Sequence, residues 1–143
     1  MFTRPPLTLY LTAKALEYRR TTWPESFVFT GPLTWEPAAT APAWLDELAR
    51  PIALVTTSSE FQDDGRLVTT TLEALSEEPV QVIATVPSAE KPGGPLPANA
   101  RVETFLPHIP ILAHAACAIT HGGAGATQKA LAAGVPVCVV PFG

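Results

Sequence analysis

The sequence contains few of the residues from which metal centres and disulfide frameworks are built. It has two cysteines, Cys117 and Cys138, and three histidines. Neither cysteine has a His or Cys partner at metal-ligand spacing, so no metal site is predicted. Each cysteine lies inside an apolar run, and we therefore expect two buried free thiols in a reducing compartment.

Charged residues are also scarce, and no basic excess is present. Lys and Arg number 9 against 13 Asp and Glu, which gives a net charge of -4 at pH 7. This balance provides no electrostatic footprint for nucleic acid or for an anionic membrane. No segment reaches the roughly 18 uninterrupted apolar residues of a membrane span, and no signal-peptide core is present at the N-terminus. We expect a cytoplasmic protein with no nucleic-acid partner.

Proline, by contrast, is abundant, and it separates two regions of the chain. The first 40 residues contain two expected strands, Leu7–Leu11 and Ser26–Gly31. A segment rich in Pro and Ala follows from Pro32 to Pro42, and its composition is typical of a linker. At 143 residues the chain is long enough for one hydrophobic core.

From Ala43 onward, short apolar strands alternate with helical patterns. Helices are expected at 44–49, 67–75, 109–115 and 127–133, and strands at 52–57, 80–86, 101–103, 118–120 and 135–140. This alternation predicts an α/β fold with βαβ units, a Rossmann-like parallel sheet with flanking helices. The pattern stops after a strand, where another loop and helix would follow, so we expect an incomplete sheet in a chain truncated at its C-terminus.

The turn from His121 to Thr127 lies between an apolar strand and a helical pattern. Unpaired amides and the positive end of the macrodipole make such a helix start a favourable anion site. The glycines at 122, 123 and 125 permit positive φ and close approach of an anion, and His121 and Thr127 add side-chain donors. The turn is neither a dinucleotide fingerprint nor a Walker loop. By themselves these residues leave both a diphosphate role and a close-packing role open.

Several motifs follow one another in a fixed order between Phe105 and Gly143. They are Phe-Leu-Pro-His at 105–108, Leu-Ala-His at 112–114, the glycine-rich turn, Gly-Val-Pro at 134–136 and Val-Pro at 140–141. This order resembles the donor-binding region of nucleotide-sugar-dependent glycosyltransferases of the GT-B fold. The similarity is greatest to the bacterial macrolide and antibiotic enzymes and extends to plant and animal UDP-glycosyltransferases. It implies that residues 1–40 are the tail of an acceptor domain with the interdomain linker, and that 41–143 form the donor-binding domain.

The resemblance also implies roles for individual residues. The implied diphosphate-binding residues are His121, Gly122, Gly123, Gly125, Ala126, Thr127 and, from an earlier loop, Ser59. The implied base-binding residues are Phe105, Leu106 and His108. On the residues alone, a core position for Phe105 is favoured over a stacking one. No catalytic residue is expected in this chain, because the family's catalytic base belongs to the acceptor domain.

Some positions depart from the family's pattern. His108 stands where many relatives have a base-contacting Gln, Ser58 replaces a Gly, and Ala126 stands where relatives often carry Ser or Thr. Lys129 stands where many relatives have a ribose-binding Glu, and an ammonium group cannot accept a hydrogen bond from a hydroxyl. We expect Lys129 to lie near the phosphates or in solvent.

The resemblance therefore implies a hexosyltransferase that uses a UDP- or dTDP-sugar and a hydroxyl of a small lipophilic acceptor such as a macrolide, polyketide or flavonoid. No other cofactor and no metal are expected. The chain would need an N-terminal acceptor domain and would be inactive alone. One alternative is a non-catalytic nucleotide-binding or partner module with a degenerate donor site, which Ala126 and Lys129 favour. Another is a nucleotide-sugar epimerase or a lipid-linked cell-wall glycosyltransferase on the same architecture.

Overall fold

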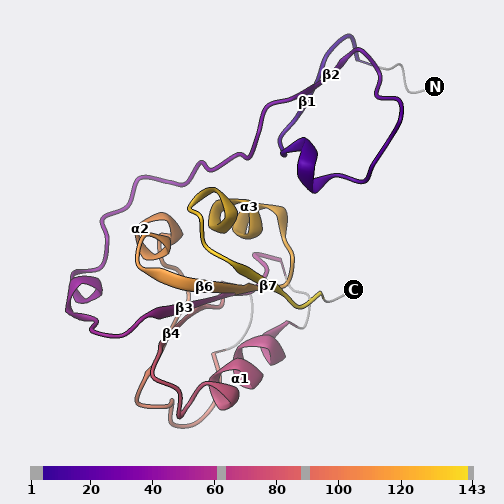
Figure 1. Cartoon of the computed structure of the whole chain (residues 1–143). Coiled ribbons are helices and arrows are strands. Elements are labelled where there is room, and N and C mark those ends of the chain that lie inside the picture. The colour runs from indigo at the N-terminus through magenta and orange to yellow at the C-terminus, as the bar shows by residue number, and fades with distance from the viewer. Residues whose placement is uncertain (1–4, 61–63, 88–90, 142–143) are drawn as a thin grey trace.

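The computed structural model describes residues 5–60, 64–87 and 91–141, and Figure 1 shows their arrangement. Near the N-terminus, β1 (Thr8–Tyr10) pairs in parallel with β2 (Phe27–Phe29), and a short 3-10 helix, Lys14–Leu16, lies between them in sequence. Both strands that were expected before residue 40 are thus present, and both are shorter than expected. One face of the pair carries an aromatic cluster in which the Trp23 and Phe29 ring centroids are 4.8 Å apart. On the other face, Leu9 and its neighbour Val28 are exposed.

A five-stranded parallel sheet forms the larger part of the structure. Its strands are β3 (Ile52–Thr56), β4 (Gln81–Thr85), β5 (Ala100–Glu103), β6 (Ala115–Thr120) and β7 (Val137–Val139). They are ordered β5-β4-β3-β6-β7, and every neighbouring pair is parallel. The predicted Rossmann-like sheet is confirmed. Because the chain moves from β3 to β4 on one side and continues with β6 on the other, the strand order reverses at β3, where such sheets bind ligands.

Helices cover both faces of this sheet, as Figure 1 shows. α1 (Gly65–Ala74) lies on one face, and α2 (His108–Leu112) and α3 (Ala124–Ala132) lie on the other. Successive side chains of a strand point to opposite faces. On β3, Leu54 accordingly packs in the core with residues of α2 and α3, whereas Val55 packs in the core with α1. The two cores bury the interior strands on both sides, which explains their continuous apolar sequences.

Several expected boundaries need correction. The first helix after the linker is a 3-10 helix, Ala43–Glu47, and the helix expected to reach residue 115 ends at Leu112, so that β6 begins at Ala115. The helix after the glycine-rich turn begins at Ala124, three residues before the expected start at Thr127. Gly125 lies in the first turn of this helix. A single glycine there costs at most about 1 kcal/mol and does not prevent the helix from starting before it.

The expectation of two buried thiols was wrong. Cys117 is half-buried and Cys138 is exposed. Cys138 belongs to β7, which is an edge strand of the sheet. Within the described part of the chain, no helix is long and apolar enough to cross a membrane. No group of three or more potential metal ligands occurs among the described residues.

Candidate functional site

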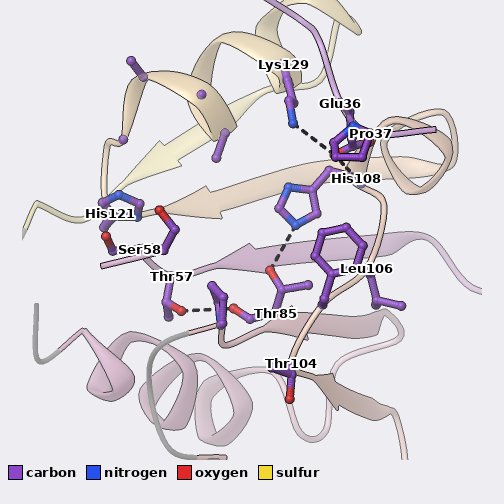
Figure 2. A pocket seen from close by; sticks show the side chains of 17 residues that line it. Glu36, Pro37, Thr57, Ser58, Thr85, Thr104, Leu106, His108, His121 and Lys129 are labelled. Atoms are coloured by element: carbon purple, nitrogen blue, oxygen red, sulfur yellow. Dashed lines mark hydrogen bonds and ion pairs between the residues drawn. The ribbon is translucent and has the colours of Figure 1, made fainter. Parts of the chain in front are cut away.

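A pocket of about 450 Å³ lies at the carboxyl ends of the strands, where the strand order reverses (Figure 2). The loop after β3, the end of β4, the segment before α2, the start of α3 and the Pro- and Ala-rich segment before Ala43 all contribute to it. Its lining residues are Glu36, Pro37, Thr57, Ser58, Ser59, Thr85, Pro87, Thr104, Phe105, Leu106, His108, His121, Gly123, Ala124, Gly125, Ala126 and Lys129.

The start of α3 forms one wall of the pocket. Gly123 is the residue preceding the helix, and the first amide that bonds back to it is that of Thr127, 3.1 Å from the Gly123 carbonyl oxygen. The amides of Ala124, Gly125 and Ala126 therefore precede the first intrahelical bond. These three residues line the pocket. The amide end of a nine-residue helix, with its positive partial charge, thus borders the pocket.

The preceding turn is held by hydroxyl groups beneath it. The Gly122 amide donates to Thr120 Oγ1 at 2.9 Å, and Thr120 Oγ1 lies 3.2 Å from Thr127 Oγ1. Of the three glycines expected to use positive φ, only Gly122 does so, with φ of 94°. Gly122 and Thr127 are not among the lining residues, and the contacts described for them are internal to the turn. Their predicted contact with a diphosphate stays a prediction.

The imidazole of His121 lies over this helix start. A β-carbon built on Gly123 would come 2.7 Å from His121 Cε1, so only glycine leaves room for the ring in this position. His121 Nδ1 is buried and has no hydrogen-bond partner among the described residues. Buried polar atoms are rarely left unpaired, and this nitrogen lies on a residue that lines the pocket.

The segment before α2 forms the opposite wall. Phe105 is 62% exposed and lines the pocket, so the core position favoured on the residues alone is excluded. Leu106 is buried beside it. His108 Nε2 lies 3.0 Å from Thr85 Oγ1 at the end of β4. Burial lowers the pKa of His108 below its ordinary value and Lys129 adds to this, while Glu36 opposes it.

The loop after β3 is fastened by buried groups. The Ser58 amide donates to Asp64 Oδ2, and Asp64 is almost completely buried. Thr57 Oγ1 donates to the Thr85 carbonyl at 3.1 Å, which joins the ends of β3 and β4. Ser59, the next residue of this loop, is exposed and lines the pocket, and its predicted contact with a diphosphate stays a prediction.

A carboxylate from the Pro- and Ala-rich segment, that of Glu36, also lines the pocket, and sequence analysis missed it. Glu36 Oε1 accepts hydrogen bonds from the His108 amide at 3.0 Å and from Lys129 Nζ at 3.0 Å, and Glu36 Oε2 accepts one from the Ile109 amide at 2.9 Å. Burial acts to raise the pKa of Glu36, but these bonds and the Lys129 charge together lower it. Glu36 is the single charged residue between 32 and 42, which is the one signal that could have marked it.

Lys129 is not in open solvent, and its charge is paired with that of Glu36. Its side chain is 16% exposed, and it forms an ion pair with Glu36 while lining the pocket. Eight of the ten predicted site residues are brought together around this one pocket: Ser59, Phe105, Leu106, His108, His121, Gly123, Gly125 and Ala126.

The chain is similar in sequence to known proteins. Residues 69–143 match the family model described as erythromycin biosynthesis protein CIII-like, C-terminal domain. The chain is 40% identical to 4'-demethylrebeccamycin synthase of Lentzea aerocolonigenes over 139 residues, which cover 94% of this chain and 33% of that protein. The chain thus spans about a third of the length of this curated relative.

Solved structures show the same architecture. The glycosyltransferase SnogD from Streptomyces nogalater superposes with a TM-score of 0.78 at 28% identity, over 96% of this chain and 39% of that one. The glycosyltransferase VinC, solved in complex with dTDP, gives a TM-score of 0.62 at 27% identity, over 77% and 28% of the two chains. The predicted C-terminal GT-B architecture is confirmed. The chain belongs to the glycosyltransferase family defined by the erythromycin biosynthesis protein CIII-like C-terminal domain.

Proposed function

We propose that the chain forms the donor site of a glycosyltransferase that moves a hexose from a UDP- or dTDP-sugar to a hydroxyl of a small lipophilic acceptor. One juxtaposition carries the proposal. The exposed ring of Phe105 and the amide end of α3 with His121 line the same pocket of about 450 Å³. An exposed aromatic ring can stack on a nucleobase, and a helix start favours a diphosphate.

The complex of VinC with dTDP supports a nucleoside diphosphate as the ligand. In this assignment residues 41–143 are the donor-binding domain, and residues 1–40 end an acceptor domain and provide the linker. Phe105, Leu106 and His108 bind the base. His121, Ser59 and the residues Gly122, Gly123, Gly125, Ala126 and Thr127 bind or shape the diphosphate site.

The proposed chemistry divides between two parts of the enzyme. A base in the acceptor domain removes the proton of the acceptor hydroxyl, and the oxygen attacks the anomeric carbon of the sugar. The bond between that carbon and the diphosphate oxygen breaks, and the nucleoside diphosphate leaves with the bonding electrons. The amides at the start of α3 and the His121 side chain stabilise its increased negative charge. No metal ion and no further cofactor is part of this proposal.

Calorimetric titration of the 143-residue chain with UDP, dTDP, uridine and thymidine tests the proposal. We expect His121→Ala to weaken diphosphate binding by about 10-fold or more, the effect of losing a hydrogen bond to a charged group, and to change nucleoside binding little. His114→Ala is the matched control, because His114 is exposed and does not line the pocket. Absence of binding by both UDP and dTDP at millimolar concentration would contradict the proposal, as would equal weakening of nucleotide and nucleoside.

The same titration addresses the alternative of a non-catalytic module. Lys129, which favoured that alternative in the sequence, has a partner in Glu36 and is not a stray charge in the pocket. Ala126 still lacks the hydroxyl that relatives often have there. Nucleotide binding without any glycosyl transfer by the protein that contains an acceptor domain would favour the module.

A further inference from the structure

In the segment between β2 and the 3-10 helix at Ala43, Glu36 makes hydrogen bonds and an ion pair to α2 and α3. Of residues 32–41, all are exposed except Glu36. The Glu36 side chain is only 7% exposed. A neighbouring tryptophan, Trp35, is 72% exposed. The anchor of this segment is therefore a carboxylate and not an apolar side chain.

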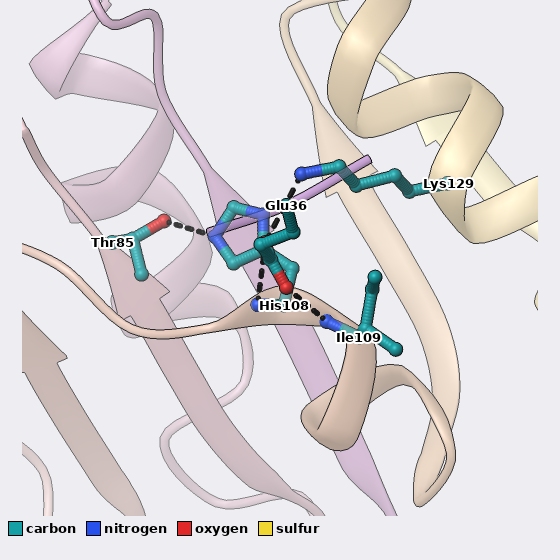
Figure 3. Close-up of polar contacts among 5 residues, drawn as sticks. All are labelled: Glu36, Thr85, His108, Ile109 and Lys129. Carbon is teal, nitrogen blue, oxygen red and sulfur yellow. Dashed lines mark hydrogen bonds and ion pairs between the residues drawn. The ribbon is translucent and has the colours of Figure 1, made fainter. Parts of the chain in front are cut away.

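This carboxylate joins elements that are far apart in the sequence, as Figure 3 shows. It accepts hydrogen bonds from the two amides at the start of α2, those of His108 and Ile109, and from the ammonium group of Lys129 on α3. His108 lies on the base-side wall of the pocket and Lys129 on the wall that begins with the α3 amides. Glu36 thus bridges the two walls between which the nucleotide is proposed to bind.

The bridge between Glu36 and Lys129 places two opposite charges where water has little access to them. The side chains of Lys129 and Glu36 are 16% and 7% exposed, so each would be a largely buried charge without the other. Removing one partner of such a pair leaves an uncompensated buried charge, which destabilises the arrangement of the groups around it. His108, the other titratable group in contact with this cluster, has its ring held by Thr85. Displacement of Glu36 would consequently release the start of α2 and Lys129 together.

We propose that Glu36 is a positioning residue that couples occupancy of the nucleotide pocket to the placement of segment 32–41. The carboxylate holds the two pocket walls at the spacing that a nucleotide fits. A bound nucleotide in turn favours the arrangement in which the segment is attached, because coupling between two sites is reciprocal. The inference rests on the proposed function, since a nucleoside diphosphate is the ligand that reports it.

Hydrogen exchange followed by mass spectrometry, combined with calorimetry, tests this coupling on the 143-residue chain. The variants are Glu36→Gln, which removes the charge, Lys129→Met, which removes its partner, and Glu103→Gln as matched control. Glu103 forms exposed ion pairs with Lys91 and Arg101 and does not line the pocket. The probes are UDP and dTDP.

In the unaltered chain and in the control variant Glu103→Gln, bound nucleotide is expected to slow hydrogen exchange in peptides covering 32–41. In Glu36→Gln, nucleotide binding should weaken by about 5-fold or more, as for a typical coupling between sites, and exchange in 32–41 should no longer respond to bound nucleotide. Lys129→Met should also reduce the response, while the α2 amides keep their acceptor. This second variant reports the coupling even if Glu36→Gln does not fold.

Different results separate the inference from the proposed function. Nucleotide that binds the unaltered chain without changing exchange in 32–41 overturns the coupling and leaves the donor site intact. So does a Glu36→Gln variant that binds nucleotide normally and still shows the response. A chain that binds neither UDP nor dTDP removes the proposed function, and the coupling with it. Equal loss of the response in Glu103→Gln would show that the effect is not specific to Glu36.

Discussion

The imidazole of His121 occupies the space that a side chain on Gly123 would need, because a β-carbon on Gly123 would lie 2.7 Å from His121 Cε1. Gly123 has φ of -57°, an ordinary value for any residue, so its backbone conformation does not require glycine. The contact with the ring is what excludes a larger residue.

Gly123→Ala is therefore expected to act through His121. The new methyl group should displace the imidazole and weaken UDP or dTDP binding by about 10-fold, as expected for loss of the hydrogen bond proposed between His121 and the diphosphate. The free energy of unfolding should change by less than about 2 kcal/mol, the usual range for substitution at this helix-capping position. Calorimetry and the histidine ring signals in NMR measure the two effects. An unchanged His121 environment in the variant would refute this explanation.

Gly125→Ala offers a contrasting substitution in the same turn. A β-carbon there would meet no heavy atom within 4 Å. Since the residue is helical, alanine should raise the free energy of unfolding by up to about 1 kcal/mol. Because Gly125 lines the pocket, we expect the added methyl group to hinder close approach of a diphosphate and to weaken nucleotide binding. Urea unfolding and calorimetry together check the opposite signs, and a gain in both quantities would contradict the prediction.

Gly122→Ala is expected to lower stability, because this glycine does use a positive φ. The value is 94°, and a β-carbon would also approach Val139 Cγ1 to 3.0 Å. Backbone strain of this kind costs about 1 to 3 kcal/mol. Urea unfolding should show a lower midpoint with an unchanged slope. A loss well below 1 kcal/mol would mean that the turn readily adopts another conformation.

Stability is expected to fall as the pH drops below about 6.5, the ordinary pKa of histidine. Burial lowers the pKa of His108 in the folded chain, so below that pH the unfolded state binds more protons than the folded state. The stabilisation present above pH 6.5 is thus lost as the pH falls through the folded pKa of His108. Urea unfolding between pH 8 and 5 should show this decline, and His108→Gln should reduce it. An identical decline in the variant would assign it to other groups.

The parallel sheet was predictable because its strands are short, apolar and separated by helical patterns. All of these are local features of the sequence. Two parts of the site, the turn before α3 and the segment that contains Phe105, are likewise local sequence motifs. The start of α3 was misplaced because glycine indicates a turn and is equally compatible with the first turn of a helix, where Gly125 lies.

Glu36 could not be assigned from the sequence for a different reason. Its partners are 72 to 93 residues away, and no periodicity connects a carboxylate in a Pro-rich segment to the start of α2 or to Lys129. Lys129 was consequently expected near phosphates or solvent. The exposure of Cys138 was missed for a related reason, since an apolar strand sequence does not reveal that the strand lies at the edge of the sheet.

The attachment of segment 32–41 through Glu36 has a practical consequence for exchanging parts between related enzymes. A hybrid chain joined before Trp35 keeps Glu36 with its partners His108 and Lys129 from the same parent, whereas a junction after Pro37 separates them. Residues on either side of Glu36 are exposed, so insertions and deletions there should be tolerated. Hybrids that differ only in whether the junction precedes or follows Glu36 should therefore differ in yield and in retention of nucleotide.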